Sequence, residues 1–193
     1  MLTAPSAARA EAGVHRNEKF GYGLAYPDGW WPSGIAYANA FDLRNYDPKK
    51  PGEVAESDRA TLMIVDTMNE NATITNRFLD GLMGGGSSRD HEHRELTIDG
   101  HRAVSVRKKM PAARLGRGAK RALPAAGSNA PPGSLWLVAT YIADGRHVVA
   151  LEASVSVEAN PKIVEEIEAI ARGVRFDAVN QDAERNQTQG EVP

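Results

Sequence analysis

The chain has 193 residues, of which 41% are apolar and 25% are charged. This length and composition are typical of one folded domain and exclude a wholly disordered chain. The formal net charge of −2 gives the molecule no strong overall attraction for nucleic acid or acidic membranes, and the absence of cysteine excludes disulfides, thiolate metal sites and a thiol nucleophile.

The first 17 residues are small, polar and aperiodic, and we predict a flexible N-terminal segment at 1–17. Within it, Ala8-Arg9-Ala10 before Glu11 is a small-x-small pattern like that preceding signal-peptidase cleavage, although the charged and apolar parts of a signal are missing. It is either the remnant of an export signal or an Ala-rich flexible end. No apolar stretch approaches the roughly 18–20 residues of a membrane-spanning helix.

Three strands are predicted next. Bulky residues alternate with small ones from Phe20 to Tyr26, which indicates a strand with one bulky face, and Pro27-Asp28-Gly29 ends it in a turn. A second extended stretch runs from Ile35 to Leu43. The third, residues 60–66, is almost wholly apolar, and we predict a central strand buried on both faces.

Two adjacent tryptophans follow the turn. We expect Trp30 to fold back and close the edge of the sheet. Trp31 points the opposite way, because neighbours on an extended chain face opposite sides. It is therefore either half-covered by a helix or exposed as a contact residue.

Two helices are predicted from apolar stripes and end signals. The first covers about residues 73–83 and ends at the glycines from 84. The second has Asn160 as its cap, Pro161 in the first turn and Gly173 at its end. The first stripe consists of Ile74, Phe78, Leu79, Leu82 and Met83, and the second of Ile163, Ile167, Ile170 and Val174.

Two hairpins lie between the helices. For the first, a two-residue loop at Asp99-Gly100 pairs Leu96 with Ala103, whereas a three-residue loop pairs Leu96 with Val104. We favour the three-residue loop, because it buries four apolar side chains on one face at roughly 1.5–3 kcal/mol each. The second hairpin turns at Asp144-Gly145 and gathers on one face Trp136, Val138, Ile142, Val149, Leu151, Ala153 and Val155.

The order of elements predicts an α+β domain with a mostly antiparallel β-sheet flanked by helices. We expect a single domain at 18–177, with a flexible basic loop at 110–133 between the hairpins and a disordered polar tail at 178–193.

Several stretches resemble the PsbP-like family over about residues 18–177. "FGYGLAYPDGWW" is similar to the start of these domains, and "NYDP", "IDGHRAV" and "IVEEIEAIARGVRF" are similar to later landmarks. The resemblance implies an α/β/α sandwich and functions of binding and assembly. Its members include an extrinsic subunit of the photosynthetic oxygen-evolving complex, a Ran-binding import factor and exported bacterial lipoproteins. The chain departs from the family in lacking a lipobox cysteine and in carrying the basic insertion.

The sequence holds no clear catalytic or metal motif. In "DHEHRE" (90–95), His91, His93 and Glu95 share a face of a strand, but HExxH would need a histidine at 95 and no third ligand is fixed by spacing. We interpret this face as solvated and polar. No G-x-S-x-G is present. We therefore predict no catalytic residues, no metal and no cofactor.

The most distinctive charge pattern lies between Gly100 and Ala143, which contain eight lysines and arginines and no Asp or Glu. The segment either meets an acidic surface or is a solvated loop, or one neutralised by acids of the tail such as Asp177. The loop at 110–133 within it has no aromatic residues to stack on bases, which disfavours nucleic acid as the partner. The candidate binding residues are Trp31, Arg114, Arg117, Lys120 and Arg121.

These observations favour a non-catalytic, exported PsbP-like domain that binds a protein partner or a cell-envelope component. The alternative is a small-ligand-binding or hydrolytic variant with a pocket between sheet and helix near Trp31. A pocket with convergent polar groups would favour the alternative.

Overall fold

The computed structural model describes residues 12–33, 40–84, 90–111 and 134–177. These residues contain two α-helices, α1 (Ala72–Met83) and α3 (Pro161–Arg172), and two short 3-10 helices, η1 (Pro51–Glu53) and η2 (Glu56–Asp58). Their strands are β1 (Gly13–Asn17), β2 (Tyr22–Tyr26), β3 (Trp31–Pro32), β4 (Ala40–Arg44), β5 (Thr61–Met68), β6 (His91–Ile98), β7 (His101–Pro111), β8 (Ser134–Asp144), β9 (His147–Ser156) and β10 (Arg175–Phe176).

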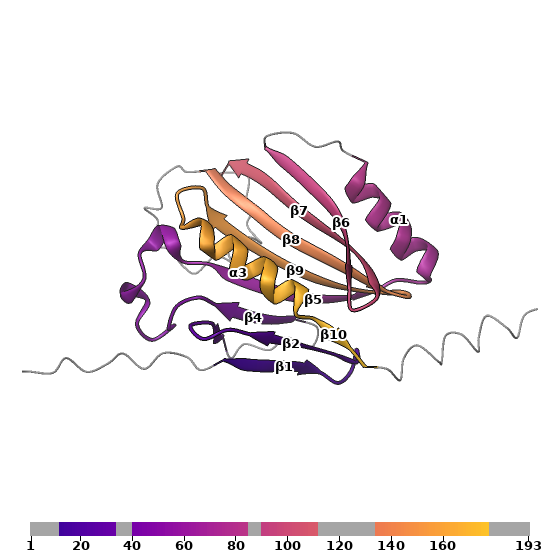
Figure 1. Cartoon of the computed structure of the whole chain (residues 1–193), viewed down its shortest axis with the longest axis horizontal. Helices are drawn as coiled ribbons and strands as arrows, with labels where there is room; N and C mark the ends of the chain where they lie inside the picture. The colour runs from indigo at the N-terminus through magenta and orange to yellow at the C-terminus, as the bar shows by residue number, and fades with distance from the viewer. Residues whose placement is uncertain (1–11, 34–39, 85–89, 112–133, 178–193) are drawn as a thin grey trace, which may run out of the picture.

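The strands form two antiparallel sheets (Figure 1). The large sheet has the order β3-β4-β5-β9-β8-β7-β6, and the small sheet has the order β1-β2-β10. The predicted α+β fold with a mostly antiparallel sheet is therefore confirmed. The strand at β5 is interior as predicted, but only one of its faces is fully buried, since Leu62 and Ile64 are buried while Met63 and Val65 are half-covered.

The two helices cover opposite faces of the large sheet. On one face, Ile163, Ile167 and Ile170 of α3 pack in the main core with β8 and β9. On the other face, Leu79 of α1 packs against Val104 on β7. The arrangement is the α/β/α sandwich that the family resemblance implies. The small sheet shares the layer of α3, since Tyr22 and Leu24 of β2 belong to the same main core.

The small sheet corrects the predicted N-terminal boundary. Residues 13–17, expected to be flexible, form β1 and pair with β2 in the register Gly13↔Tyr26 to Asn17↔Tyr22. The alternation of β1 is short and its bulky residues are few, so the sequence alone gives a weak strand signal. The basic loop also begins later than predicted, because β7 continues to Pro111, which pairs with Ser134.

Both helices begin at the asparagine caps that favour helix starts. The Asn160 side chain accepts from the backbone N–H of Lys162, and the predicted stripe of α3 is buried. The predicted burial of the α1 stripe is wrong in part. Leu79 is buried, but Ile74 and Phe78 are 36% and 42% exposed. No helix in the described ranges is long and apolar enough to cross a membrane.

The first hairpin has the two-residue turn, so the favoured three-residue loop is wrong. Leu96 pairs with Ala103, and Asp99 and Gly100 have φ angles of 51° and 84°, as a type I′ turn requires. The expectation failed because both faces of this hairpin are covered. Leu96 faces the α3 side, while Val104 faces α1, so apolar side chains need not gather on one face.

The second hairpin confirms the predicted grouping of side chains with a shifted turn. Asp144 pairs with His147, so the turn residues are Gly145 and Arg146. Ile142 pairs with Val149, and the seven predicted side chains share the face toward α3. This face positions the candidate site described next.

Candidate functional site

Three arginines from three elements converge on one carboxylate between the large sheet and α3. Arg94 lies on β6, Arg107 on β7, and Arg172 lies one turn after Glu168 on α3. The register pairs Arg94 with Ser105, so the side chain two residues on, Arg107, shares that face of the sheet. We call these four residues the arginine cluster.

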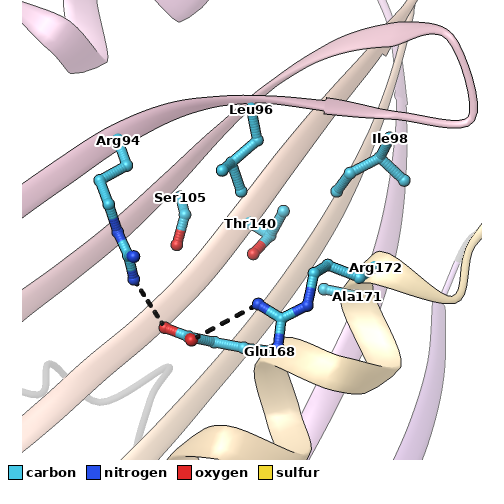
Figure 2. Close-up of a pocket in the computed structure, with 8 residues that line it drawn as sticks. All are labelled: Arg94, Leu96, Ile98, Ser105, Thr140, Glu168, Ala171 and Arg172. Atoms are coloured by element: carbon cyan, nitrogen blue, oxygen red, sulfur yellow. Dashed lines mark ion pairs between the residues drawn. The ribbon is translucent and has the colours of Figure 1, made fainter.

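The cluster has one tight contact and two looser ones. Arg107 donates through Nε to Glu168 Oε1 at 2.8 Å, and its Nη2 lies 2.6 Å from the same oxygen. Arg94 Nη2 lies 3.6 Å from Oε1, and Arg172 Nη1 lies 3.7 Å from Oε2. Figure 2 shows Arg94 and Arg172 approaching Glu168 from opposite sides. The two longer distances are those of ion pairs without a hydrogen bond.

The charges of the cluster do not balance. Three guanidinium groups against one carboxylate leave the four residues with a formal charge of +2. The exposed Glu92, which pairs with Arg107 across the hairpin, brings a second carboxylate to the same face and leaves a local charge of +1. The Glu168 side chain is only 10% exposed, whereas those of Arg94 and Arg172 are 60% and 56% exposed. The negative charge of Glu168 is therefore buried, and the excess positive charge faces solvent.

Arg102, on the other side of the hairpin, shows the opposite balance. Its guanidinium meets two carboxylates, with Nε 2.6 Å from Glu95 and Nη2 2.8 Å from Asp80. Hydrogen bonds to Glu95 and Asp80 raise the pKa of Arg102. Its positive charge is neutralised locally, unlike that of the arginine cluster.

A small cavity of about 20 Å³ adjoins the cluster, which is room for about one water molecule. The buried Ser105 and Thr140 bring hydroxyl groups to it from β7 and β8. It lies between the large sheet and α3, which is where the alternative function requires a pocket. Trp31, which that alternative placed nearby, is not among the residues that line it. Its lining residues, drawn in Figure 2, are Arg94, Leu96, Ile98, Ser105, Thr140, Glu168, Ala171 and Arg172.

A second polar cluster joins the small sheet to the large one. Asp66 on β5 accepts from Asn17 Nδ2 at 2.7 Å and from the Tyr22 hydroxyl at 3.2 Å. His147 Nε2 lies 3.4 Å from Asp66 Oδ1, and its ring stacks on Phe20. Burial, with the nearby Asp66 charge, raises the pKa of Tyr22 well above its usual range. All of these groups except the half-buried Asn17 are buried, and together they tie the two sheets to each other, which is a structural arrangement.

The structure describes one of the five predicted binding residues, Trp31. Trp31 is half-buried in β3, at the edge of the large sheet, and pairs with Arg44. Trp30 is buried in the core as expected and donates from Nε1 to Glu166 Oε2 at 3.1 Å. The four predicted basic residues, Arg114, Arg117, Lys120 and Arg121, lie outside the described residues.

The structure reduces the charge expected for the basic stretch. Of its eight cations, Arg102 and Arg107 are held by acids, and Lys109 lies 3.9 Å from Asp90. Asp177, considered as a neutralising acid of the tail, pairs instead with Arg16 at 3.0 Å. The remaining charge belongs to Lys108 and to the part of the stretch beyond Pro111.

The histidines of the "DHEHRE" stretch share a face as predicted, on the side of α1. The rings of His91 and His93 lie 5.7 Å apart. Lys108 pairs with His91 and shares this face, whereas Arg107 pairs with Glu92 and lies on the opposite face. No group of three or more metal-ligating side chains occurs within the described ranges.

Sequence reasoning missed Arg94, Glu168 and Arg172 as site residues. The spacing of Glu168 and Arg172, four residues apart on a helix, is a signal for an ion pair. Nothing in the sequence indicates that Arg94 joins them, because that contact depends on the hairpin register and on where α3 lies.

Comparisons with known proteins show likeness of fold alone. No protein-family model and no curated protein matches the sequence. Among solved structures, a protein from Bacteroides thetaiotaomicron matches 86% of this chain with a TM-score of 0.55 and 10% identity. The match covers 48% of that protein, so the chain spans about half of its length.

Two further matches have lower TM-scores. Cyanobacterial PsbP from Synechocystis matches with a TM-score of 0.47 and 12% identity over 91% of this chain and 98% of that one. A protein of unknown function from Pseudomonas aeruginosa matches with a TM-score of 0.40 and 12% identity over 95% and 98% of the two chains.

Proposed function

We propose that this chain is a non-catalytic PsbP-like domain that docks on an acidic protein partner. The observation that carries the proposal is the charge imbalance of the arginine cluster, in which one buried carboxylate meets three guanidinium groups. Interfaces place such charge opposite complementary charge, which guides encounter and sets specificity. A partner with exposed carboxylates fits this surface.

The size of the cavity supports docking over turnover at this site. Pockets for small ligands have volumes of roughly 300–1,000 Å³, whereas the cavity beside Glu168 has about 20 Å³. The alternative of a small-ligand-binding or hydrolytic variant has no such support here.

The basic segment, which is the predicted loop at 110–133, adds to the same proposal. Pro111, at the end of β7, pairs with Ser134, at the start of β8. The segment between them therefore leaves β7 four residues after Arg107. Its sequence contributes four further cations, Arg114, Arg117, Lys120 and Arg121, with no acid among them. Cations on neighbouring parts of one chain add to the local field that attracts an acidic surface.

Export belongs to the proposal as well. The Ala8-Arg9-Ala10 pattern and the resemblance to a family with exported members support it. Fractionation of cells that express the full-length gene from its own promoter tests this part. Recovery from the cytoplasm alone would contradict it.

Affinity capture from native extract tests the docking function. A variant with Arg114, Arg117, Lys120 and Arg121 changed to Gln is compared with the wild type at rising salt concentration. We expect the variant to lose the salt-sensitive partner, because screening and charge removal act on the same interaction. A control removes four exposed charges elsewhere, at Lys19, Lys49, Arg77 and Arg146. Equal capture by both variants and the wild type would reject the proposal.

A further inference from the structure

The arginine cluster contains donors that its own carboxylate does not use. Arg94 and Arg172 lie at 3.6 Å and 3.7 Å from Glu168, within ion-pair distance and beyond a normal hydrogen bond. Each guanidinium has five N–H donors in a planar fork. The side chains are more than half exposed, at 60% and 56%, so an incoming acceptor can reach them.

The surroundings of these two arginines are those of a small receptor site. The side chains approach from β6 and from α3, with the buried hydroxyl residues Ser105 and Thr140 and the apolar Leu96 between them (Figure 2). The cavity has room for about one water molecule. A single acceptor oxygen fits that volume, and the rest of its group would lie at the mouth.

We infer that the site between Arg94 and Arg172 binds a carboxylate group carried by an acidic segment of the partner protein. The inference rests on the proposed docking function and names the chemistry that is recognised. Arg107 is already held by Glu168 at 2.6 Å and 2.8 Å and serves to position that carboxylate. The binding residues are Arg94 and Arg172.

The fixed charge of Glu168 favours a carboxylate over a phosphate monoester. With Glu92 on the same face counted, the local formal charge is +1, which one carboxylate cancels and a dianion reverses to −1. The dianion also places twice the charge beside Glu168, whose side chain is 10% exposed and therefore weakly screened.

The same features favour a peptide over a membrane surface. The site is one recess between a strand and a helix, with apolar side chains next to the charges. An extended acidic peptide can place one side chain in such a recess and others along the exposed arginines. A bilayer surface needs a broad array of cations to gain comparable attraction.

The test is a nuclear magnetic resonance titration of the isotope-labelled full chain, with the arginine Nε–Hε signals observed. The probes are a blocked hexaglutamate peptide, a blocked hexaglutamine peptide, acetate and inorganic phosphate. We expect saturable shifts of Arg94 and Arg172 with hexaglutamate, weaker ones with acetate and none with hexaglutamine. Phosphate that binds more tightly than hexaglutamate would overturn the choice of ligand.

Three variants make the result specific. Arg94→Ala with Arg172→Ala should weaken hexaglutamate binding at least about tenfold, or about 1.4 kcal/mol. Arg77→Ala removes one guanidinium from an exposed position on α1, which covers the opposite face of the sheet, and should leave the affinity unchanged. Glu168→Gln should strengthen binding several-fold, because it frees the cluster of its internal carboxylate; a purely structural role for Glu168 predicts no gain.

Equal affinity of the double variant and the wild type would overturn the inference. If partner capture still depends on the basic segment in that case, the proposed docking function stands and only the carboxylate site fails. If hexaglutamate binds at Arg94 and Arg172 but capture shows no salt-sensitive partner, the proposed function fails and the site remains.

Discussion

The guanidinium of Arg107, on β7, holds the carboxylate of Glu168, on α3, with Nε at 2.8 Å and Nη2 at 2.6 Å from the same oxygen. This pair fixes the helix against the β6–β7 hairpin and turns the carboxylate toward Arg94 and Arg172. It is therefore both a tertiary contact and the centre of the positively charged surface.

Replacing Glu168 by Gln is expected to destabilise the fold by about 1–3 kcal/mol, because a charge-assisted hydrogen bond is lost in a largely buried position. Urea unfolding measures the change. Glu165→Gln is the matched control, since Glu165 is exposed one turn earlier on the same helix, and its effect should stay within about 0.5 kcal/mol. Equal effects of the two substitutions would mean that the Arg107 contact adds no stability.

Tyr22 should make the fold sensitive to alkali. Its pKa is raised above the ordinary 10.0, first because burial disfavours the phenolate and second because of the Asp66 charge. The unfolded chain thus releases this proton at lower pH, so the stabilisation is complete below pH 10.0 and falls as the pH rises above it. Unfolding free energy measured between about pH 8 and 11 should decline less steeply in Tyr22→Phe than in the wild type. Identical slopes for Tyr22→Phe and the wild type would contradict the claim that burial of the Tyr22 hydroxyl raises its pKa.

His15 should make the stability of the fold depend on pH in the acid range. Burial lowers its pKa below 6.5, with Asp66 opposing the shift. The unfolded chain therefore takes up the proton first, so the stabilisation is present above pH 6.5 and is lost as the pH falls below it. His15→Phe keeps a ring to stack on Phe41, which lies 3.8 Å away between centroids. It should lose less stability than the wild type between about pH 7 and 5, and a steeper loss would refute this assignment.

Two Gly→Ala substitutions should have opposite effects. Gly100 has a φ of 84°, so Ala there is strained and should cost about 1–2 kcal/mol although no atom lies within 4 Å of the added carbon. Gly81 lies within α1, also with open space, and Ala there should add about 0.5–1 kcal/mol. Both are read from urea unfolding. A stabilising Gly100→Ala would argue against the two-residue turn.

The local parts of this fold could be predicted from the sequence. Asn160, Pro161 and Gly173 marked the ends of α3 because caps and proline act through neighbouring backbone groups. The alternation of β2 and the position of the turn after it were equally local. The predicted antiparallel sheet followed from these elements.

The non-local parts were predicted less well. The hairpin register was wrong because one covered face was assumed, whereas α1 and α3 cover both faces. Ile74 and Phe78 of α1 were expected to be buried, but α1 covers only part of its face. The arginine cluster escaped prediction for the same reason, since Arg94 and Glu168 meet only when the hairpin and the last helix are assembled.

The surface potential around the arginine cluster tests the central claim most directly. Paramagnetic relaxation of backbone amides by an anionic and a cationic nitroxide of the same size reports that potential without any partner. Because the cluster keeps a local formal charge of +1 with Glu92 counted, the amides of Arg94 and Arg172 should relax faster with the anionic nitroxide than with the cationic one. Equal relaxation by the two, or faster relaxation by the cationic nitroxide, would contradict a surface built to receive carboxylates.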